Sequence, residues 1–185
     1  MNRLIHWSIV LLAAGGCHRR HTLSNNPTTL PAPSGLTQYA NTQHGIRLDY
    51  PAGWTVHPSD DYVLLLLPPG VDRPQTCSIS LDIPDLPPHL PGMIRIGMIK
   101  DGYLDDLRKK APDLKIVDDQ PHPIDSATGR IIQTTWTSAG RPYSESVLLL
   151  IHKSDVFLIR STSDTDHQST ARQVFEQIIG SIRWQ

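Results

Sequence analysis

The chain has 185 residues, of which 38% are hydrophobic and 19% are charged, a composition that suits one globular domain with appended segments. Its formal net charge is −1, so it lacks the basic excess expected of a nucleic-acid-binding protein. The 16 prolines and 12 glycines favour short strands and turns over a helical bundle. No stretch approaches the ~20 apolar residues of a membrane-spanning helix.

The N-terminus has the layout of a bacterial secretory signal. Arg3 supplies a positive charge, and residues 4–14 form a short, mostly apolar segment. Small residues at positions 14–16 stand directly before Cys17. Small residues ending at a cysteine resemble a lipoprotein signal, and the resemblance implies that the cysteine becomes the lipidated first residue of the mature protein. We therefore expect a signal peptide over residues 1–16 and an acylated Cys17 that anchors the protein to a membrane.

A second interpretation of the N-terminus stays open. Ala14 stands three positions before the cysteine, where lipoprotein signals usually have leucine. An ordinary signal peptide cut near Ala14 or Gly16 would leave Cys17 with a free thiol, and an oxidising compartment would then permit a disulfide with Cys77. If Cys17 carries lipid, Cys77 has no partner. Because Cys77 lies in an alternating strand pattern, the sequence predicts a buried, unreactive thiol there.

The segment that follows the cysteine is predicted to be a tether. Residues 18–38 are rich in Ser, Asn, Thr and Pro, and such a segment buries too little apolar surface to offset the entropy of ordering it. We expect residues 17–38 to connect the lipid anchor flexibly to a folded domain. His18, rather than an aspartate, follows the cysteine. By resemblance to Gram-negative lipoproteins, this favours the outer membrane, facing the periplasm, over the inner membrane.

The folded domain is expected over residues 39–185, long enough for one substantial core. Residues 46–50 alternate between apolar and polar side chains, as in a half-buried strand. Pro, Ala and Gly at 51–53 predict a turn, and residues 54–56 are expected to return as the second strand of a hairpin, with Trp54 in the core. The continuous apolar run at 62–67 predicts a central strand that is covered on both faces.

Two amphipathic helices are predicted. Over residues 93–110, apolar side chains recur at helical spacing, and Pro112 stops the helix. These positions are Ile96, Ile99, Tyr103, Leu104 and Leu107. The second helix is expected over residues 166–182, with Asp164, Thr165 or Asp166 as its cap.

Strand patterns flank the first helix. One strand is expected before it, at residues 76–83. A meander of strands joined by short turns is expected after it, at residues 114–118, 130–137, 144–152 and 155–162. Antiparallel strands with helices packed on them give an α+β fold.

The order of these elements resembles the PsbP-like family. The resemblance rests on a Gly-Ile-x-Leu-x-Tyr-Pro-x-Gly-Trp motif at residues 45–54, the long middle helix, the meander, and an Ile-x-x-Ser-Ile-Arg ending at residues 178–183. That family includes the extrinsic photosystem II protein and related small lipoproteins, and the similarity spans about residues 40–183. It implies an antiparallel sheet sandwiched between helices, acting as a protein-binding or assembly module without catalysis of its own.

A proline-rich loop is the first candidate for a partner surface. Prolines at 84, 87, 88 and 91 restrain the chain around Leu86, His89 and Leu90, and a preordered loop loses less entropy when it docks. The alternative is a rigid connector. Trp184 joins this candidate surface, because it lies near the chain end and tryptophan is enriched at binding hot spots.

Other functions receive less support from the sequence. Nine histidines raise the alternative of a periplasmic ligand or metal carrier binding zinc or copper, but no pair has helical i, i+4 spacing, so we assign no metal ligand. An envelope hydrolase is the least supported class, since there is no Gly-x-Ser-x-Gly motif. Strand alternation predicts that Glu145 faces solvent. We therefore expect no catalytic residue and no cofactor.

Overall fold

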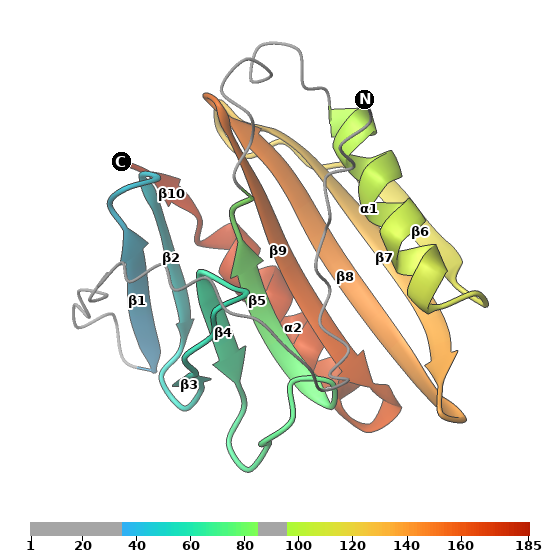
Figure 1. Ribbon diagram of the computed structural model, residues 1–185. Helices are drawn as coiled ribbons and strands as arrows, with labels where there is room; N and C mark the ends of the chain where they lie inside the picture. The colour runs from blue at the N-terminus through green and yellow to red at the C-terminus, as the bar shows by residue number, and fades with distance from the viewer. Residues whose placement is uncertain (1–34, 85–95) are drawn as a thin grey trace.

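Antiparallel strands make up most of the structure. The computed structural model describes residues 35–84 and 96–185 (Figure 1). In these two segments the strands form a three-stranded sheet, in the order β1-β2-β10, and a seven-stranded sheet, in the order β3-β4-β5-β9-β8-β7-β6. The smaller sheet contains β1 (Leu36–Asn41), β2 (Ile46–Pro51) and β10 (Arg183–Trp184). The larger sheet contains β3 (Thr55–Val56), β4 (Leu64–Leu67), β5 (Cys77–Asp82), β6 (Lys115–Pro121), β7 (Thr128–Ser138), β8 (Arg141–His152) and β9 (Asp155–Asp164).

Among the described residues, one α-helix lies on each face of the seven-stranded sheet. α1 (Ile96–Lys110) packs on β7 and β8. α2 (Gln168–Gly180) follows a 3-10 turn at Thr165–His167 and packs on β5, β8 and β9 from the opposite side. Figure 1 shows α1 in front of the sheet and α2 behind it. The expected α+β fold, an antiparallel sheet between helices, is confirmed.

The core lies in two layers because successive side chains of a strand point to opposite faces. In β9, Val156 and Leu158 pack in the cluster that contains α1. Phe157 and Ile159 pack in the cluster that contains α2. Each fully buried side chain of this size contributes about 1.5–3 kcal/mol relative to an exposed one. The central strands therefore contribute apolar surface to both layers.

The expected opening hairpin is wrong. β2 pairs with β1 and β10, whereas β3 pairs with β4 in the other sheet. The turn itself is present, because the Trp54 amide donates a hydrogen bond to the Pro51 carbonyl over 2.9 Å. It carries the chain from one sheet to the other, and Trp54 is buried beneath it, as expected.

The first strand of the structure, β1, was not predicted from the sequence. Residues 36–38 fall within the expected tether, yet they belong to β1, which pairs with β2 from Leu36 opposite Pro51 to Asn41 opposite Ile46. These residues pair with β2 through the backbone, and their side chains are half-buried. The folded domain therefore includes residues before position 39.

Most of the other expected elements are confirmed. They include β5, α1 with its apolar stripe, the β6-β7-β8-β9 meander and α2, whose preceding 3-10 turn is capped by the Asp164 side chain. Cys77 is fully buried with a free thiol. β4 is buried on both faces, as expected, but it lies next to the short edge strand β3 instead of at the centre. None of the helices in the described segments is long and apolar enough to cross a membrane.

Candidate functional site

The face of the seven-stranded sheet that carries α1 is apolar beneath the helix and polar beside it. In β8, Val147 and Leu149 pack in the α1 cluster, and the next side chain on that face is Glu145. In β9, the corresponding positions after Leu158 are Arg160 and Thr162. The strand register sets Glu145 opposite Thr162 and Val147 opposite Arg160, so the charged side chains of Glu145 and Arg160 are diagonal neighbours on this face.

Glu145 is buried, with 5% of its surface exposed, so the expectation that it faces solvent is wrong. Its Oε1 accepts a hydrogen bond from the Tyr103 hydroxyl of α1, and its Oε2 accepts one from the Thr162 hydroxyl over 3.0 Å. Burial and the negative charge of Glu145 raise the pKa of Tyr103 well above its ordinary value. Tyr103 therefore keeps its proton and acts as the donor.

Arg160 is the second buried charge, with 4% of its surface exposed. Its Nη2 lies 3.8 Å from Oδ2 of Asp82, within ion-pair range but beyond a hydrogen bond. Its guanidinium carbon lies 4.9 Å from the centroid of the Tyr62 ring, in a cation–π arrangement. Burial raises the pKa of Asp82, and the charge of Arg160 opposes that effect. The positive charge of Arg160 therefore offsets only part of the cost of burying the Asp82 carboxylate.

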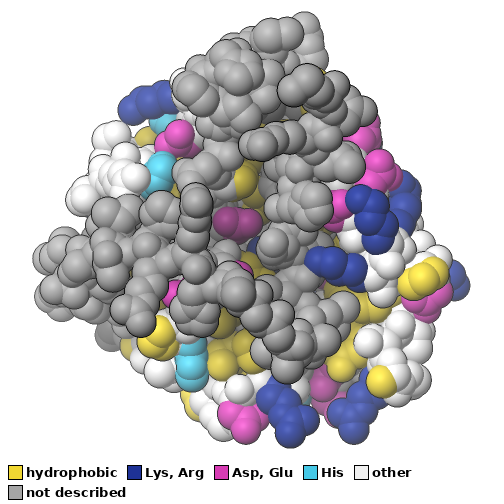
Figure 2. All heavy atoms as spheres, in the orientation of Figure 1, with side chains coloured by type: hydrophobic (Ala, Val, Ile, Leu, Met, Phe, Trp, Pro, Cys, Tyr) yellow, Lys and Arg dark blue, Asp and Glu magenta, His cyan; other side chains and the backbone are white. Residues whose placement is uncertain are grey.

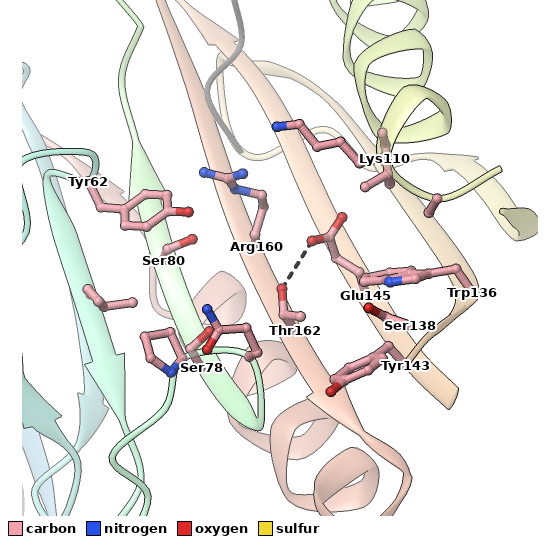
Figure 3. Close-up of a pocket in the computed structure, with 15 residues that line it drawn as sticks. Tyr62, Ser78, Ser80, Lys110, Trp136, Ser138, Tyr143, Glu145, Arg160 and Thr162 are labelled. Carbon is pink, nitrogen blue, oxygen red and sulfur yellow. Dashed lines mark hydrogen bonds between the residues drawn. The ribbon is translucent and has the colours of Figure 1, made fainter. Parts of the chain in front are cut away.

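A pocket of about 110 Å³ opens between the end of α1 and the sheet. Figure 3 shows Tyr62, Ser78 and Ser80 on one side of this pocket. Arg160 and Glu145 lie in the middle of it. Trp136 and Tyr143 form the opposite wall, with ring centroids 5.9 Å apart and planes inclined by 17°. The pocket therefore combines buried charges with an aromatic wall.

On the helix side of the pocket, basic residues gather in the last turn of α1. Lys110, the last residue of α1, lines the mouth, and Figure 3 shows its side chain on the far side of Arg160 from Tyr62. Figure 2, in the orientation of Figure 1, shows Lys and Arg side chains along the α1 side and the lower edge, interspersed with Asp and Glu side chains and with hydrophobic ones.

Most of the sequence-predicted site residues lie outside the described residues. These are Cys17, Leu86, His89 and Leu90. Trp184 lies within the described residues and is half-buried in β10. Its ring centroid is 3.9 Å from that of His152, on which it stacks, and 5.3 Å from that of Phe157. Those neighbours belong to the α2 side of the sheet, so the structure does not bring Trp184 to the pocket.

The described histidines do not gather into a metal site. In residues 35–84 and 96–185, no group of three or more His, Cys, Asp or Glu side chains has the geometry to hold a metal ion. Two histidines instead lie beside carboxylates: His44 Nδ1 is 2.9 Å from Asp155, and His167 Nδ1 is 2.7 Å from Asp164.

Arg160 is absent from the sequence-based candidates, although the sequence carries a signal for it. The apolar run at residues 156–159 leads directly to Arg160 within one strand. A strand that is apolar on both faces has no solvent face, so a charge inside it needs a partner or a function. A similar signal exists for Glu145, which lies in the same strand two residues before the apolar run at residues 147–151.

Known structures resemble this one, although no protein-family model matches the sequence and no curated protein matches it significantly. The solution structure of cyanobacterial PsbP from Synechocystis sp. PCC 6803 matches with a TM-score of 0.62 at 12% identity, covering 83% of this chain and 95% of that one. The chain has the PsbP-like fold. LpqN of Mycobacterium tuberculosis, described as involved in cell envelope biogenesis, matches with a TM-score of 0.54 at 12% identity, covering 85% of this chain and 89% of that one. At these identities the likeness concerns the PsbP-like fold alone.

Proposed function

We propose that this chain is a lipid-anchored bacterial envelope protein whose PsbP-like domain is a non-catalytic binding module for another protein. The anchor is the acylated Cys17, and the tether lets the domain face the periplasm, from the outer membrane in preference to the inner one. The pocket beside α1 is the recognition site. The observation that carries this function is the buried Arg160 at the base of a pocket with an aromatic wall.

The residue types around the pocket support binding to a protein. Arginine, tryptophan and tyrosine are the residues most enriched among binding hot spots, and here Arg160, Trp136 and Tyr143 line one cavity. The aromatic side chains are half-exposed at the wall, whereas the arginine is buried at the base. This arrangement offers apolar contact area around one specific polar contact.

The chemistry of the buried groups also supports recognition over catalysis. Both oxygens of Glu145 already accept hydrogen bonds from hydroxyl groups, which holds the carboxylate in place. Arginine keeps its charge at all physiological pH values and so is suited to binding rather than to proton transfer. An envelope location is supported by the signal-like N-terminus and by the LpqN likeness, since LpqN is involved in cell envelope biogenesis.

Mass spectrometry of the protein from membranes of its native host, after crosslinking in living cells, tests this function. We expect a diacylglyceryl-modified Cys17 and one recurrent crosslinked protein. Trp136→Ala should remove that crosslink, and Met98→Ala, which alters an exposed apolar side chain on α1, should keep it. An unmodified Cys17 in the soluble fraction would refute the anchor. Turnover of ester, peptide or glycan substrates by the purified protein would refute the non-catalytic role.

A further inference from the structure

One edge of the Arg160 guanidinium lacks a hydrogen-bond acceptor. Its Nε and Nη2 atoms are both buried, and neither has a hydrogen-bond partner within the described residues. Arg130 and Arg172 are more exposed, and each donates to a carboxylate. Leaving a buried charged donor without an acceptor costs more than leaving a buried neutral donor without one. The most buried of these three arginines is therefore the one whose hydrogen bonding is incomplete.

The carboxylates nearest to Arg160 do not fill this role. Glu145 is engaged through both of its oxygens, by Tyr103 and Thr162. Oδ2 of Asp82 stands 3.8 Å from Nη2, too far for a hydrogen bond. The Tyr62 ring faces the guanidinium and provides no in-plane acceptor. An acceptor from outside the described chain is needed to complete the site.

The pocket has room for such a group and for an apolar body attached to it. Its volume of about 110 Å³ is several times the ~10–15 Å³ that one water requires. Beside its polar base it is lined by the buried apolar side chains of Leu65, Leu107 and Ala111, and by Trp136. Lys110 adds a second positive charge at the mouth.

We propose that the pocket binds a carboxylate carried on an apolar group, and that Nε and Nη2 of Arg160 hold its two oxygens. These two nitrogens present parallel N–H bonds, and their spacing matches the two oxygens of a carboxylate. A singly charged group suits the site better than a phosphate dianion, because Asp82 and Glu145 lie close by and repel additional negative charge. The inference rests on the proposed function of the pocket as a recognition site.

Two sources can supply this chemistry: the chain end of a protein partner, or a free small carboxylic acid. The test titrates the purified full chain with hexanoate and, separately, with a short peptide ending in leucine. Each acid is matched by its neutral amide, hexanamide or the C-terminally amidated peptide. Calorimetry measures binding, and tryptophan fluorescence, to which Trp136 at the pocket wall contributes, provides a second signal.

We expect at least one acid to bind about tenfold or more tightly than its amide, because a bidentate, charge-assisted contact is lost in the amide. Which acid binds identifies the source. Arg160→Lys keeps the positive charge but loses the two parallel N–H donors of the guanidinium, and should weaken acid binding about tenfold or more. Arg172→Lys, on the exposed face of α2, should bind like the unaltered protein.

Three results would overturn the inference. They are equal binding of acid and amide, unchanged acid binding by Arg160→Lys, and no binding of any of these acids at millimolar concentration. The acid–amide comparison uses the unaltered protein, so it decides the question even if Arg160→Lys fails to fold. If acid binding fails while Trp136→Ala still loses its crosslinked partner, the carboxylate assignment is wrong and the binding function stands. If the partner crosslink also survives Trp136→Ala, the pocket is not the recognition site.

Discussion

Replacing Glu145 by alanine should destabilise the domain strongly. The substitution leaves the hydroxyls of Tyr103 and Thr162 without their acceptor, and Tyr103 is 1% exposed. Removing a charged hydrogen-bond acceptor costs about 1.5–3 kcal/mol per bond, and breaking a buried charged network typically costs about 3–5 kcal/mol. We therefore expect the free energy of unfolding to fall by about 3–5 kcal/mol, which lowers the Tm by roughly 6–20 °C for a domain of this size.

Urea unfolding of the full chain, followed by tryptophan fluorescence, measures this change. Glu145→Gln keeps one acceptor oxygen and should lose about half as much stability or less. The control is Glu176→Ala on α2, which removes an exposed carboxylate paired with Arg172 and should change stability by no more than ~0.5 kcal/mol. If Glu145→Ala were as stable as Glu176→Ala, Glu145 would face solvent and the buried network described above would not exist.

Three further predictions test the packing. Gly129→Ala should lower the free energy of unfolding by about 1–3 kcal/mol, because the added Cβ would lie 2.1 Å from the His122 carbonyl oxygen. Gly97→Ala is the control: its Cβ would lie in open space on α1, and the variant should be slightly more stable in the same unfolding assay. Burial lowers the pKa of His152 below 6.5, so the native state binds fewer protons than the unfolded chain, and stability should fall as the pH drops below about 6.5. The pH–stability profile of His152→Gln should be flatter in that range. An unchanged slope would show that His152 does not have a lowered pKa in the native state. Burial raises the pKa of Cys77 to about 11, so its thiol should react slowly with iodoacetamide. Peptide mapping should find Cys77 unmodified in the native protein and modified in urea. Fast labelling of the native protein would contradict its burial.

The helices and the meander were predictable because their patterns are local. In α1, the buried residues Ile99, Tyr103 and Leu107 recur every four residues, and such a stripe predicts a helix whatever it packs on. The turn at Lys153 likewise follows from a short polar stretch between two apolar runs. These signals need only a few neighbouring residues, so the sequence carries them completely.

The opening hairpin failed because strand pairing is not local. Residues 51–53 specify a turn, and a turn is present, but turn chemistry does not determine which strand the outgoing chain joins. β2 pairs with β10 at the far end of the chain, through Arg183 opposite Arg47. No short stretch of sequence contains that contact.

The sequence by itself determined most of the helices and strands, though not β1 or β10, together with the α+β class and the resemblance to PsbP-like proteins, since periodicity and turn residues act over a few positions. The pocket was decided only by the tertiary structure. Alternation assigns Glu145 to one face of β8, but its burial depends on Tyr103, 42 residues away, which α1 brings over that face. Arg160 is buried at the pocket base for the same reason: the sheet register and the position of α1 together set which charges lose contact with water.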